Sequence, residues 1–140
     1  MGGIKVRVEA VIFNQQREIL LARHEKDNRS YWVLPGGSVE LYENLDKALV
    51  RELKEELGIQ QAFVESLLYI DEYIDNKAKR HVVRAAFVTR IDDGELENME
   101  VVSKNEAIKE VRFFSAASIR KSDDTFYPSK ELFIKLMQPM

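Results

Sequence analysis

The sequence contains no cysteine and only two histidines in 140 residues. The absence of cysteine excludes disulfide bonds, thiolate metal sites and a cysteine nucleophile, and two histidines argue against a histidine-rich zinc site. No apolar run approaches the roughly 18 residues that a membrane-spanning helix needs, and the N-terminus lacks a signal-peptide pattern. We therefore expect a soluble, cytoplasmic protein that does not associate with a membrane.

The composition is that of a folded domain. Hydrophobic residues make up 45% of the sequence and charged residues 32%, which is typical of a globular chain with a hydrophobic core. The length predicts one domain, residues 1–140, without a repeat or an internal linker. The formal net charge of −3 argues against a protein that coats a nucleic-acid backbone, so nucleic acid is not an expected partner.

The pattern of apolar residues predicts a mixture of strands and helices. Strands are predicted at residues 4–14, 19–24, 63–74, 81–91 and 111–115. The first two are expected to pair as a hairpin, residues 25–30 to form a polar loop, and residues 92–95 to form a turn. Helices are predicted at about 44–57, ended by Gly58, and at 129–137, with Ser129 as N-cap. Because βαβ units do not alternate regularly, we expect an α/β fold with helices flanking a mixed β-sheet.

The first predicted helix carries carboxylates on its apolar side. At about 100° per residue from Leu45, the later leucines fall within about 40–120°, while Glu52 and Glu56 fall near 340° and 20° and Glu55 near 280°. Like charges at this spacing beside an apolar surface are costly unless a cation offsets them. Arg51 supplies one positive charge. A hard divalent cation that takes oxygen ligands, Mg²⁺ or Mn²⁺, is the natural source of the remaining positive charge.

An ordinary solvated helix face is the alternative interpretation, because glutamate is a strong helix former. The loop before the helix provides a second observation on which to choose between a solvated face and a binding site. Gly36 and Gly37 follow Pro35 there, and glycine lets the backbone approach a metal or a phosphate closely. The loop and the helix together therefore favour a binding site.

The loop and the helix also fill a longer pattern without exception. Its specified positions are occupied by Gly37, Glu43, Arg51, Glu52, Leu53, Glu55, Glu56, Gly58 and Ile59. This spacing resembles the Nudix box, G-x5-E-x7-R-E-U-x-E-E-x-G-U with U a bulky aliphatic residue. Seven fixed residue types would coincide by chance about once in 10⁸ windows. The chain thus resembles a MutT-like member of the Nudix hydrolase family, with Tyr42 as a small departure where many members have glycine.

The resemblance implies a Nudix α/β/α sandwich over essentially the whole chain. It also implies hydrolysis of the pyrophosphate linkage of a nucleoside diphosphate joined to another group, with Mg²⁺ or Mn²⁺ as cofactor. The resemblance does not decide whether the substrate is an NTP or oxidised NTP, a dinucleoside polyphosphate or a nucleotide sugar. No proline lies between Gly58 and Pro128, so the proline of the ADP-ribose members is absent.

Three further possibilities follow from the resemblance. The first is a catalytically silent, nucleotide-binding regulatory module, although such proteins typically lose box glutamates. The second is a messenger-RNA decapping type of enzyme, which the net charge does not favour. The third is assembly as a homodimer, because members of the family are often homodimers.

The resemblance assigns roles residue by residue. The implied metal ligands are Gly36, Glu52, Glu55 and Glu56, with the carbonyl of Gly37 as an alternative to that of Gly36. The three glutamates are also the expected catalytic residues. The residues expected to hold the box in shape are Gly37, Glu43, Arg51 and Gly58. Glu106 is the candidate for an additional ligand or general base, and Glu110 comes after it.

Outside the box, a few residues are candidates for holding the substrate. Arg23 and Arg84 are candidate contacts for a phosphate or a base. Tyr73 and Phe126 are candidates for stacking on a nucleobase, whereas Tyr69 is expected in the core.

Overall fold

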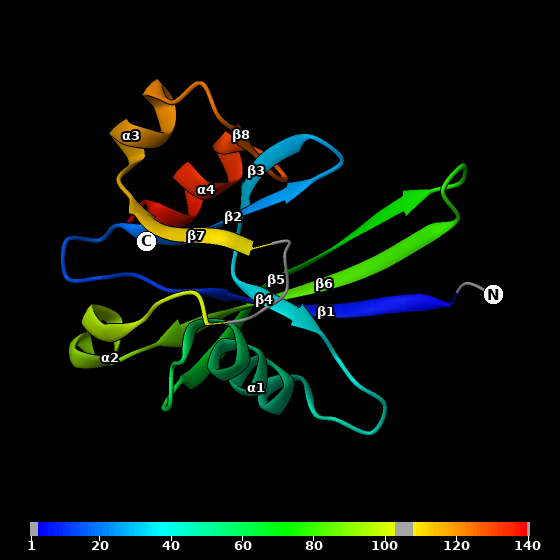
Figure 1. Cartoon of the computed structure of the whole chain (residues 1–140), viewed down its shortest axis with the longest axis horizontal. Helices are drawn as coiled ribbons and strands as arrows, with labels where there is room; N and C mark the ends of the chain where they lie inside the picture. The colour runs from blue at the N-terminus through cyan, green and yellow to red at the C-terminus, as the bar shows by residue number, and fades with distance from the viewer. Residues whose placement is uncertain (1–2, 103–107, 140) are drawn as a thin grey trace.

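The computed structural model describes residues 3–102 and 108–139, and their strands build two four-stranded sheets (Figure 1). The first sheet has the order β4–β1–β6–β5 and comprises β1 (Ile4–Val11), β4 (Gly36–Ser38), β5 (Phe63–Asp75) and β6 (Arg80–Arg90). β1 and β6 run parallel, and the two outer pairs are antiparallel. The first sheet is therefore mixed.

The second sheet has the order β7–β2–β3–β8. It comprises β2 (Ile19–Lys26), β3 (Arg29–Val33), β7 (Ile108–Phe114) and β8 (Thr125–Phe126). β3 and β8 run parallel, and the other pairs are antiparallel.

Helices flank the sheets on both outer sides. Figure 1 shows α1 (Leu45–Leu57) and α2 (Asp93–Asn98) on one side, and α3 (Ala116–Lys121) and α4 (Lys130–Met137) on the other. The predicted α/β fold with mixed strands between helices is confirmed, and the structure adds that the strands divide between two sheets. Within the described ranges, no helix is both long and apolar enough to cross a membrane.

The helix that carries the box packs on the first sheet. Leu49, Leu53 and Leu57 are buried and belong to one core with Val8 and Ala10 of β1. The helix bounds agree with the prediction, and Gly58 ends α1 with φ at 71°, a left-handed conformation that suits glycine. The leucine stripe is thus buried as the helical wheel predicts.

The second sheet has a separate core that is largely aromatic. The Trp32 ring lies edge-on to Phe114, with centroids 4.8 Å apart, and Phe114 lies 5.4 Å from Phe126. Phe126 in turn faces Phe133 of α4. The Ser129 hydroxyl accepts a hydrogen bond from the Leu132 amide at 3.1 Å, which confirms the predicted N-cap of α4.

The predicted hairpin between the first two strands is wrong. β1 and β2 belong to different sheets, and their connection is limited to a bridge between Phe13 and Ile19 and a few backbone bonds, such as those from the Leu20 amide to the Ile12 carbonyl and from the Asn14 amide to the Glu18 carbonyl. Each strand is central in its own sheet and pairs on both edges with strands that come later in the chain. Pairing partners distant in sequence therefore replace the local hairpin.

Two predicted irregular segments are in fact regular structure. In place of the loop at 25–30, β2 and β3 are joined by Asp27 and Asn28, with φ at 53° and 62°. Aspartate and asparagine tolerate this left-handed backbone, which suits a two-residue hairpin turn. In place of the turn at 92–95, the chain enters α2, a short helix that buries Leu96.

A core substitution in α1 tests this packing. Leu53→Ala removes a fully buried side chain and should lower the free energy of unfolding by about 2–5 kcal/mol. Leu45→Ala, at a side chain that is 40% exposed on the same helix, should change it by less than about 1 kcal/mol. Urea unfolding of both variants provides the comparison, and equal losses would contradict the packing.

Candidate functional site

The two glycines of the loop lie where no side chain fits. On β4, a Cβ at Gly36 would overlap the backbone of Val8 in β1, and a Cβ at Gly37 would overlap the carboxylate of Glu52. The backbone contact with Val8 therefore requires glycine at position 36, whereas a side chain at position 37 would displace the end of the Glu52 side chain. As a result, the Glu52 carboxylate lies directly against the backbone of the loop.

The guanidinium of Arg51 joins this loop to α1. It donates to both carboxylate oxygens of Glu43, at 2.7 and 2.9 Å, and to the Ser38 carbonyl at 3.0 Å. Its Nη1 atom donates to Glu52 at 3.0 Å and to Glu55 at 3.2 Å. The hydrogen bonds from Arg51 lower the pKa of Glu43 to about 2, and those to Glu43 raise the pKa of Arg51.

The box carboxylates differ in exposure. The Glu52 side chain is 13% exposed and that of Glu55 59% exposed, while Glu56 is half-buried. Burial first, and then the negative charge of Glu52, raise the pKa of Glu56 to about 8. Ionisation of Glu56 is therefore unfavourable in its buried position beside Glu52, and a bound cation would relieve this.

Oxygen donors are the set that a hard divalent cation takes, and the carboxylates with the Gly36 carbonyl provide such a set. Among residues 3–102 and 108–139, however, no three acidic or histidine side chains are already grouped as a metal site. The guanidinium of Arg51 contacts one carboxylate oxygen of Glu52 and one of Glu55. The second oxygen of each carboxylate makes no contact with Arg51, so the residues fit a divalent ion in chemistry.

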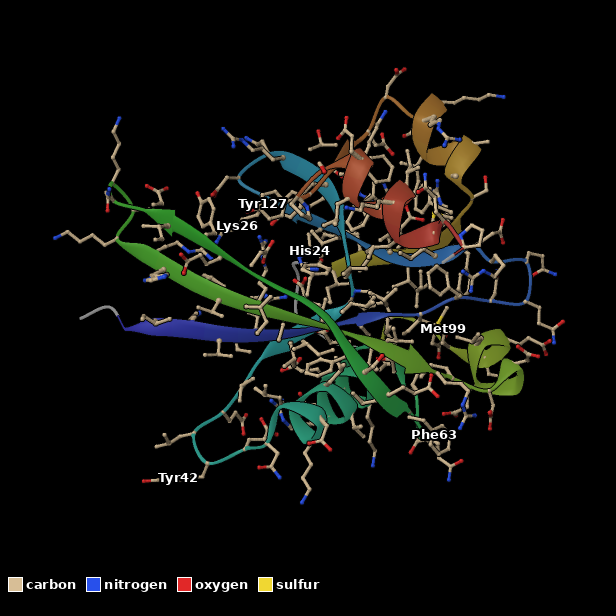
Figure 2. The ribbon with its side chains drawn as sticks, turned by 180° about the vertical axis from the view of Figure 1, so that it is seen from behind. His24, Lys26, Tyr42, Phe63, Met99 and Tyr127 are labelled. Atoms are coloured by element: carbon tan, nitrogen blue, oxygen red, sulfur yellow. The ribbon has the colours of Figure 1, made fainter. Side chains whose placement is uncertain are left out.

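A cleft of about 990 Å³ opens between the two sheets, beside the box. Its charged lining residues are mainly basic, namely Arg7, Lys26, Arg29, Arg80 and Arg84 against Glu9, Asp27 and Asp75. Tyr31, Tyr73, Tyr127 and His24 also line it. Figure 2 shows His24, Lys26 and Tyr127 where β2 and β3 face the long strands β5 and β6. A cleft with cations and aromatic rings suits an anionic ligand that carries a ring system.

Arg84 is fixed at the floor of this cleft. It is 8% exposed, donates twice to Asp71 at 2.8 and 2.9 Å, and lies 4.8 Å from the centroid of the Tyr127 ring. Arg7, on the neighbouring strand, lies 3.9 Å from Glu9, and its positive charge partly offsets the rise in the pKa of Glu56. Arg7 therefore connects the box carboxylates electrostatically with the cleft.

The predicted substrate residues have different surroundings. Arg84 and Tyr73 line the cleft, whereas Arg23 is not among its lining residues and donates to Glu110 at 2.9 Å. Phe126 is buried in the aromatic core. Glu106 lies outside the described residues.

Sequence reasoning missed the residues of β1 that line the cleft. Lys5, Arg7 and Glu9 alternate with apolar residues along that strand, and Arg7 and Glu9 reach the cleft. The alternating charges were the available signal, because side chains two apart lie on the same face of a strand. No spacing pattern in the sequence indicates that Tyr127 lines the cleft.

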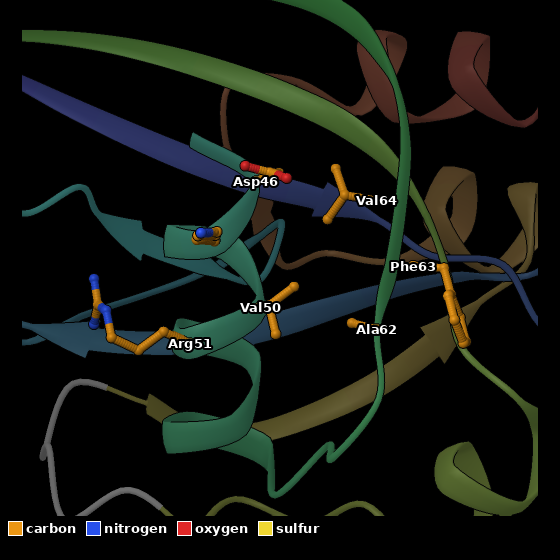
Figure 3. A pocket seen from close by; sticks show the side chains of 7 residues that line it. Asp46, Val50, Arg51, Ala62, Phe63 and Val64 are labelled. Carbon is orange, nitrogen blue, oxygen red and sulfur yellow. The ribbon is translucent and has the colours of Figure 1, made fainter. Parts of the chain in front are cut away.

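A second cavity of about 460 Å³ lies between α1 and the start of β5 (Figure 3). Val50, Ala62, Phe63 and Val64 line it together with charged residues of α1. None of the box glutamates lines it. Arg51 does line it, so the cavity adjoins the box at this arginine.

The fold and the box are those of one family, and comparison with known proteins agrees. The model of the NUDIX domain matches residues 3–137. The chain therefore belongs to the Nudix hydrolase family, as the sequence predicted.

Two curated relatives match parts of this chain. An ADP-ribose pyrophosphatase from Methanocaldococcus jannaschii is 31% identical over 116 residues, which cover 83% of this chain and 64% of that protein. A CTP pyrophosphohydrolase from Escherichia coli is 44% identical over 57 residues, 39% of this chain and 42% of that protein. The chain thus spans less than two thirds of the length of these curated relatives.

Solved structures agree on the fold. A MutT protein from Methanosarcina mazei superposes with a TM-score of 0.74 at 22% identity, covering 96% of this chain and 92% of that one. At this identity the likeness extends to the fold, and MutT-like structural neighbours agree with the predicted resemblance.

The Arg51–Glu43 contact predicts a pH dependence of stability. Because the pKa of Glu43 falls from 4.5 to about 2 on folding, its stabilisation is fully present above about pH 4.5 and is lost as the pH falls toward 2. Glu43→Gln should therefore be less stable than the wild type at pH 7, and the difference should shrink at pH 3. Urea unfolding at both pH values measures it. Glu97→Gln, at an exposed position of α2, is the control, and a difference that grows toward low pH would contradict the prediction.

Proposed function

We propose that this chain is a metal-dependent hydrolase that cleaves the pyrophosphate linkage of a nucleoside diphosphate joined to another group, by attack of water at phosphorus. The observation that carries the proposal is the group of box glutamates on α1, where burial and the charge of Glu52 raise the pKa of Glu56, beside a mainly basic cleft. Members of this family typically use a divalent metal, and the donor set suits Mg²⁺ or Mn²⁺.

In this proposal Glu52, Glu55 and Glu56, with the carbonyl of Gly36, hold the ion. A divalent ion supplies neutralisation of phosphate oxygens and a bound water of lowered pKa. Glu106 serves as an additional ligand or general base. Glu110 is a weaker candidate, because Arg23 and Arg112 already donate to its carboxylate at 2.9 and 3.1 Å.

The chain's own residues perform the positioning. Arg51 keeps the loop and α1 together through Glu43 and holds one oxygen each of Glu52 and Glu55. Arg7 lies between the box and the cleft and attracts the phosphate groups toward the carboxylates, where their own negative charge would otherwise repel them. Tyr73 and Tyr127 provide flat surfaces for a nucleobase at the outer cleft.

The substrate is a nucleotide of one of several kinds. The relatives include enzymes named for ADP-ribose and for CTP, so their names do not choose among an NTP or oxidised NTP, a dinucleoside polyphosphate and a nucleotide sugar. Arg23 remains a candidate phosphate contact only for a substrate that extends beyond the cleft, because it is paired with Glu110.

A catalytically silent nucleotide-binding module is the second candidate. The observation that favours it is the engagement of Glu52 and Glu55 by Arg51, which leaves no ready-made metal group among the described residues. The two candidates differ in whether added metal binds these glutamates.

A substrate panel tests the proposal. Phosphate and pyrophosphate release from NTPs, ADP-ribose, dinucleoside polyphosphates and nucleotide sugars is measured with Mg²⁺, with Mn²⁺ and with EDTA. Turnover should appear for one class and vanish with EDTA. Nucleotide-induced thermal shifts without turnover under either metal would instead support the silent module.

Variants of α1 test the ligand assignment. Glu55→Gln and Glu56→Gln should each reduce kcat by at least about 100-fold, since changes behind metal ligands already cost 10- to 100-fold. The thermal unfolding midpoint serves as the check that the fold is intact. Asp46→Asn, an exposed acidic residue in the first turn of the same helix, should retain activity. Full activity in the Glu56 variant would show that Glu56 is not a metal ligand.

A further inference from the structure

Two β-hairpins end at the mouth of the cleft and carry basic side chains. In Figure 1 the β2–β3 and β5–β6 hairpins end on the same side of the molecule. Lys26 and Arg29 form the last pair of the β2–β3 ladder, and Arg80 belongs to the last pair of the β5–β6 ladder. These three residues, here called the mouth cations, all line the cleft. Positive charge therefore reaches the mouth from both sheets.

The mouth cations differ from the arginines deeper in the cleft. Arg84 donates twice to Asp71, and Arg7 lies 3.9 Å from Glu9. The mouth cations, in contrast, make no ion pair and no side-chain hydrogen bond within residues 3–102 and 108–139. Their N–H groups therefore remain available to a ligand.

Two acidic residues line the same end of the cleft, Asp27 and Asp75. Asp27 occupies the two-residue turn of the β2–β3 hairpin. The Asp75 carboxylate is already engaged, because one oxygen accepts hydrogen bonds from the Lys77 and Ala78 amides and the other from the Tyr73 hydroxyl. Three cations against these two acids leave the mouth with a positive balance.

Aromatic rings lie between the mouth and the inner arginines. His24 and Tyr31, a pair two residues inward on β2 and β3, have ring centroids 5.8 Å apart. On the first sheet, Tyr73 lies two residues inward from the hairpin end, and its ring lies edge-on to Tyr127 at 6.4 Å. All four side chains line the cleft. From the inside outward, the cleft thus presents cations, then rings, then cations again.

The spacing of the two cationic zones suits a nucleoside. Arg84 and Arg80 are four residues apart on β6 and both line the cleft, so their Cα atoms are about 13 Å apart. The arginine side chains shorten the gap between the two guanidinium groups. A nucleoside with a phosphate on each side fits between them, with its base against the aromatic rings.

We infer that the mouth cations form a second anion subsite, which takes a phosphate carried by the ribose of the substrate, away from the pyrophosphate that is cleaved. This inference rests on the proposed function, because it names a feature of the nucleotide that the cleft accepts. The expected ligand is a small nucleotide with a 2′- or 3′-phosphate, since a net charge of −3 does not favour a polymeric nucleic acid.

The chemistry of the mouth cations selects a phosphate in this position. Lysine and arginine both donate charge-assisted hydrogen bonds to phosphate oxygens. An ordinary NTP, a dinucleoside polyphosphate and a nucleotide sugar carry all of their phosphates on the 5′ side of the nucleoside. Such ligands would occupy the inner arginines and leave the mouth cations without a partner. A ribose phosphate engages both zones at once.

The test measures binding of adenosine 3′,5′-bisphosphate, its 2′,5′ isomer, AMP and ADP by calorimetry. Metal is left out, so that the result does not depend on hydrolysis. At least one bisphosphate should bind about 10-fold more tightly than AMP, as expected for charge-assisted hydrogen bonds at an exposed site. ADP adds its phosphate on the 5′ side and controls for charge alone.

Variants of the mouth cations locate the effect. Lys26→Gln and Arg80→Gln should each reduce the advantage of the bisphosphate over AMP by about 3- to 10-fold, with a much smaller loss for AMP and ADP. Both residues are exposed, so both variants should fold. The matched control is Lys77→Gln, which removes the same charge from the β5–β6 hairpin outside the cleft lining. It should behave as the wild type.

A dinucleotide distinguishes two sources of the same chemistry. The 5′-phosphorylated dinucleotide pApA carries a phosphodiester in the place of the 3′-phosphate. It should bind more weakly than the bisphosphate, because a diester offers less charge and fewer free oxygens. Equal binding with the same loss in Arg80→Gln would overturn the small-nucleotide assignment in favour of a nucleic-acid end.

Several results would overturn the subsite itself. These are equal affinities for AMP and both bisphosphates, a gain for ADP that depends on the mouth cations to the same extent, an equal loss in Lys77→Gln, or no binding of any nucleotide. Turnover of nucleotides without a preference for a ribose phosphate would leave the proposed function standing alone. A bisphosphate preference without turnover of any substrate would leave the subsite standing without the hydrolase.

Discussion

The guanidinium of Arg51 is the interaction on which the candidate site depends. It makes hydrogen bonds to the loop through Glu43 and the Ser38 carbonyl, and to its own helix through Glu52 and Glu55. These contacts fix how far α1 lies from β4. Gly37 then allows the Glu52 carboxylate to rest on the loop backbone, where a Cβ would overlap it. A loop and a helix that are adjacent in sequence thereby act as one rigid unit.

The same arginine sets the electrostatic state of the carboxylates. Glu52 and Glu55 share its positive charge, while the half-buried Glu56 does not contact it and has the raised pKa. One guanidinium does not offset four neighbouring glutamates, including Glu43. A divalent ion would add the missing charge. Arg51 contacts one oxygen each of Glu52 and Glu55, so the second oxygen of each is the one that such an ion would take, whereas Glu43 gives both of its oxygens to Arg51.

The box could be predicted from the sequence because its geometry is local. Helical spacing alone places Glu52 and Glu56 beside the leucine stripe, and glycines at both ends mark the loop and the helix end. The β1–β2 hairpin was wrong because strand partners are chosen by burial across the whole chain, and β1 finds its partners at residues 36–38 and 80–90. The cleft could not be predicted for the same reason, since its lining comes from strands of both sheets. The overall charge of −3 gives no sign of its basic lining.

Fold and recognition place different demands on this sequence. Gly36 and Leu53 are determined by close packing, since a larger side chain at the first or a smaller one at the second disturbs the structure. Glu9 is the opposite case, because its burial opposes folding and no described residue satisfies it by a hydrogen bond. Packing accounts for the box and the core, which agrees with the fold being kept at 22% identity in a structural neighbour. The feature that packing does not explain is the charged lining of the cleft, and recognition of a ligand is a physical reason for strands to carry such residues there.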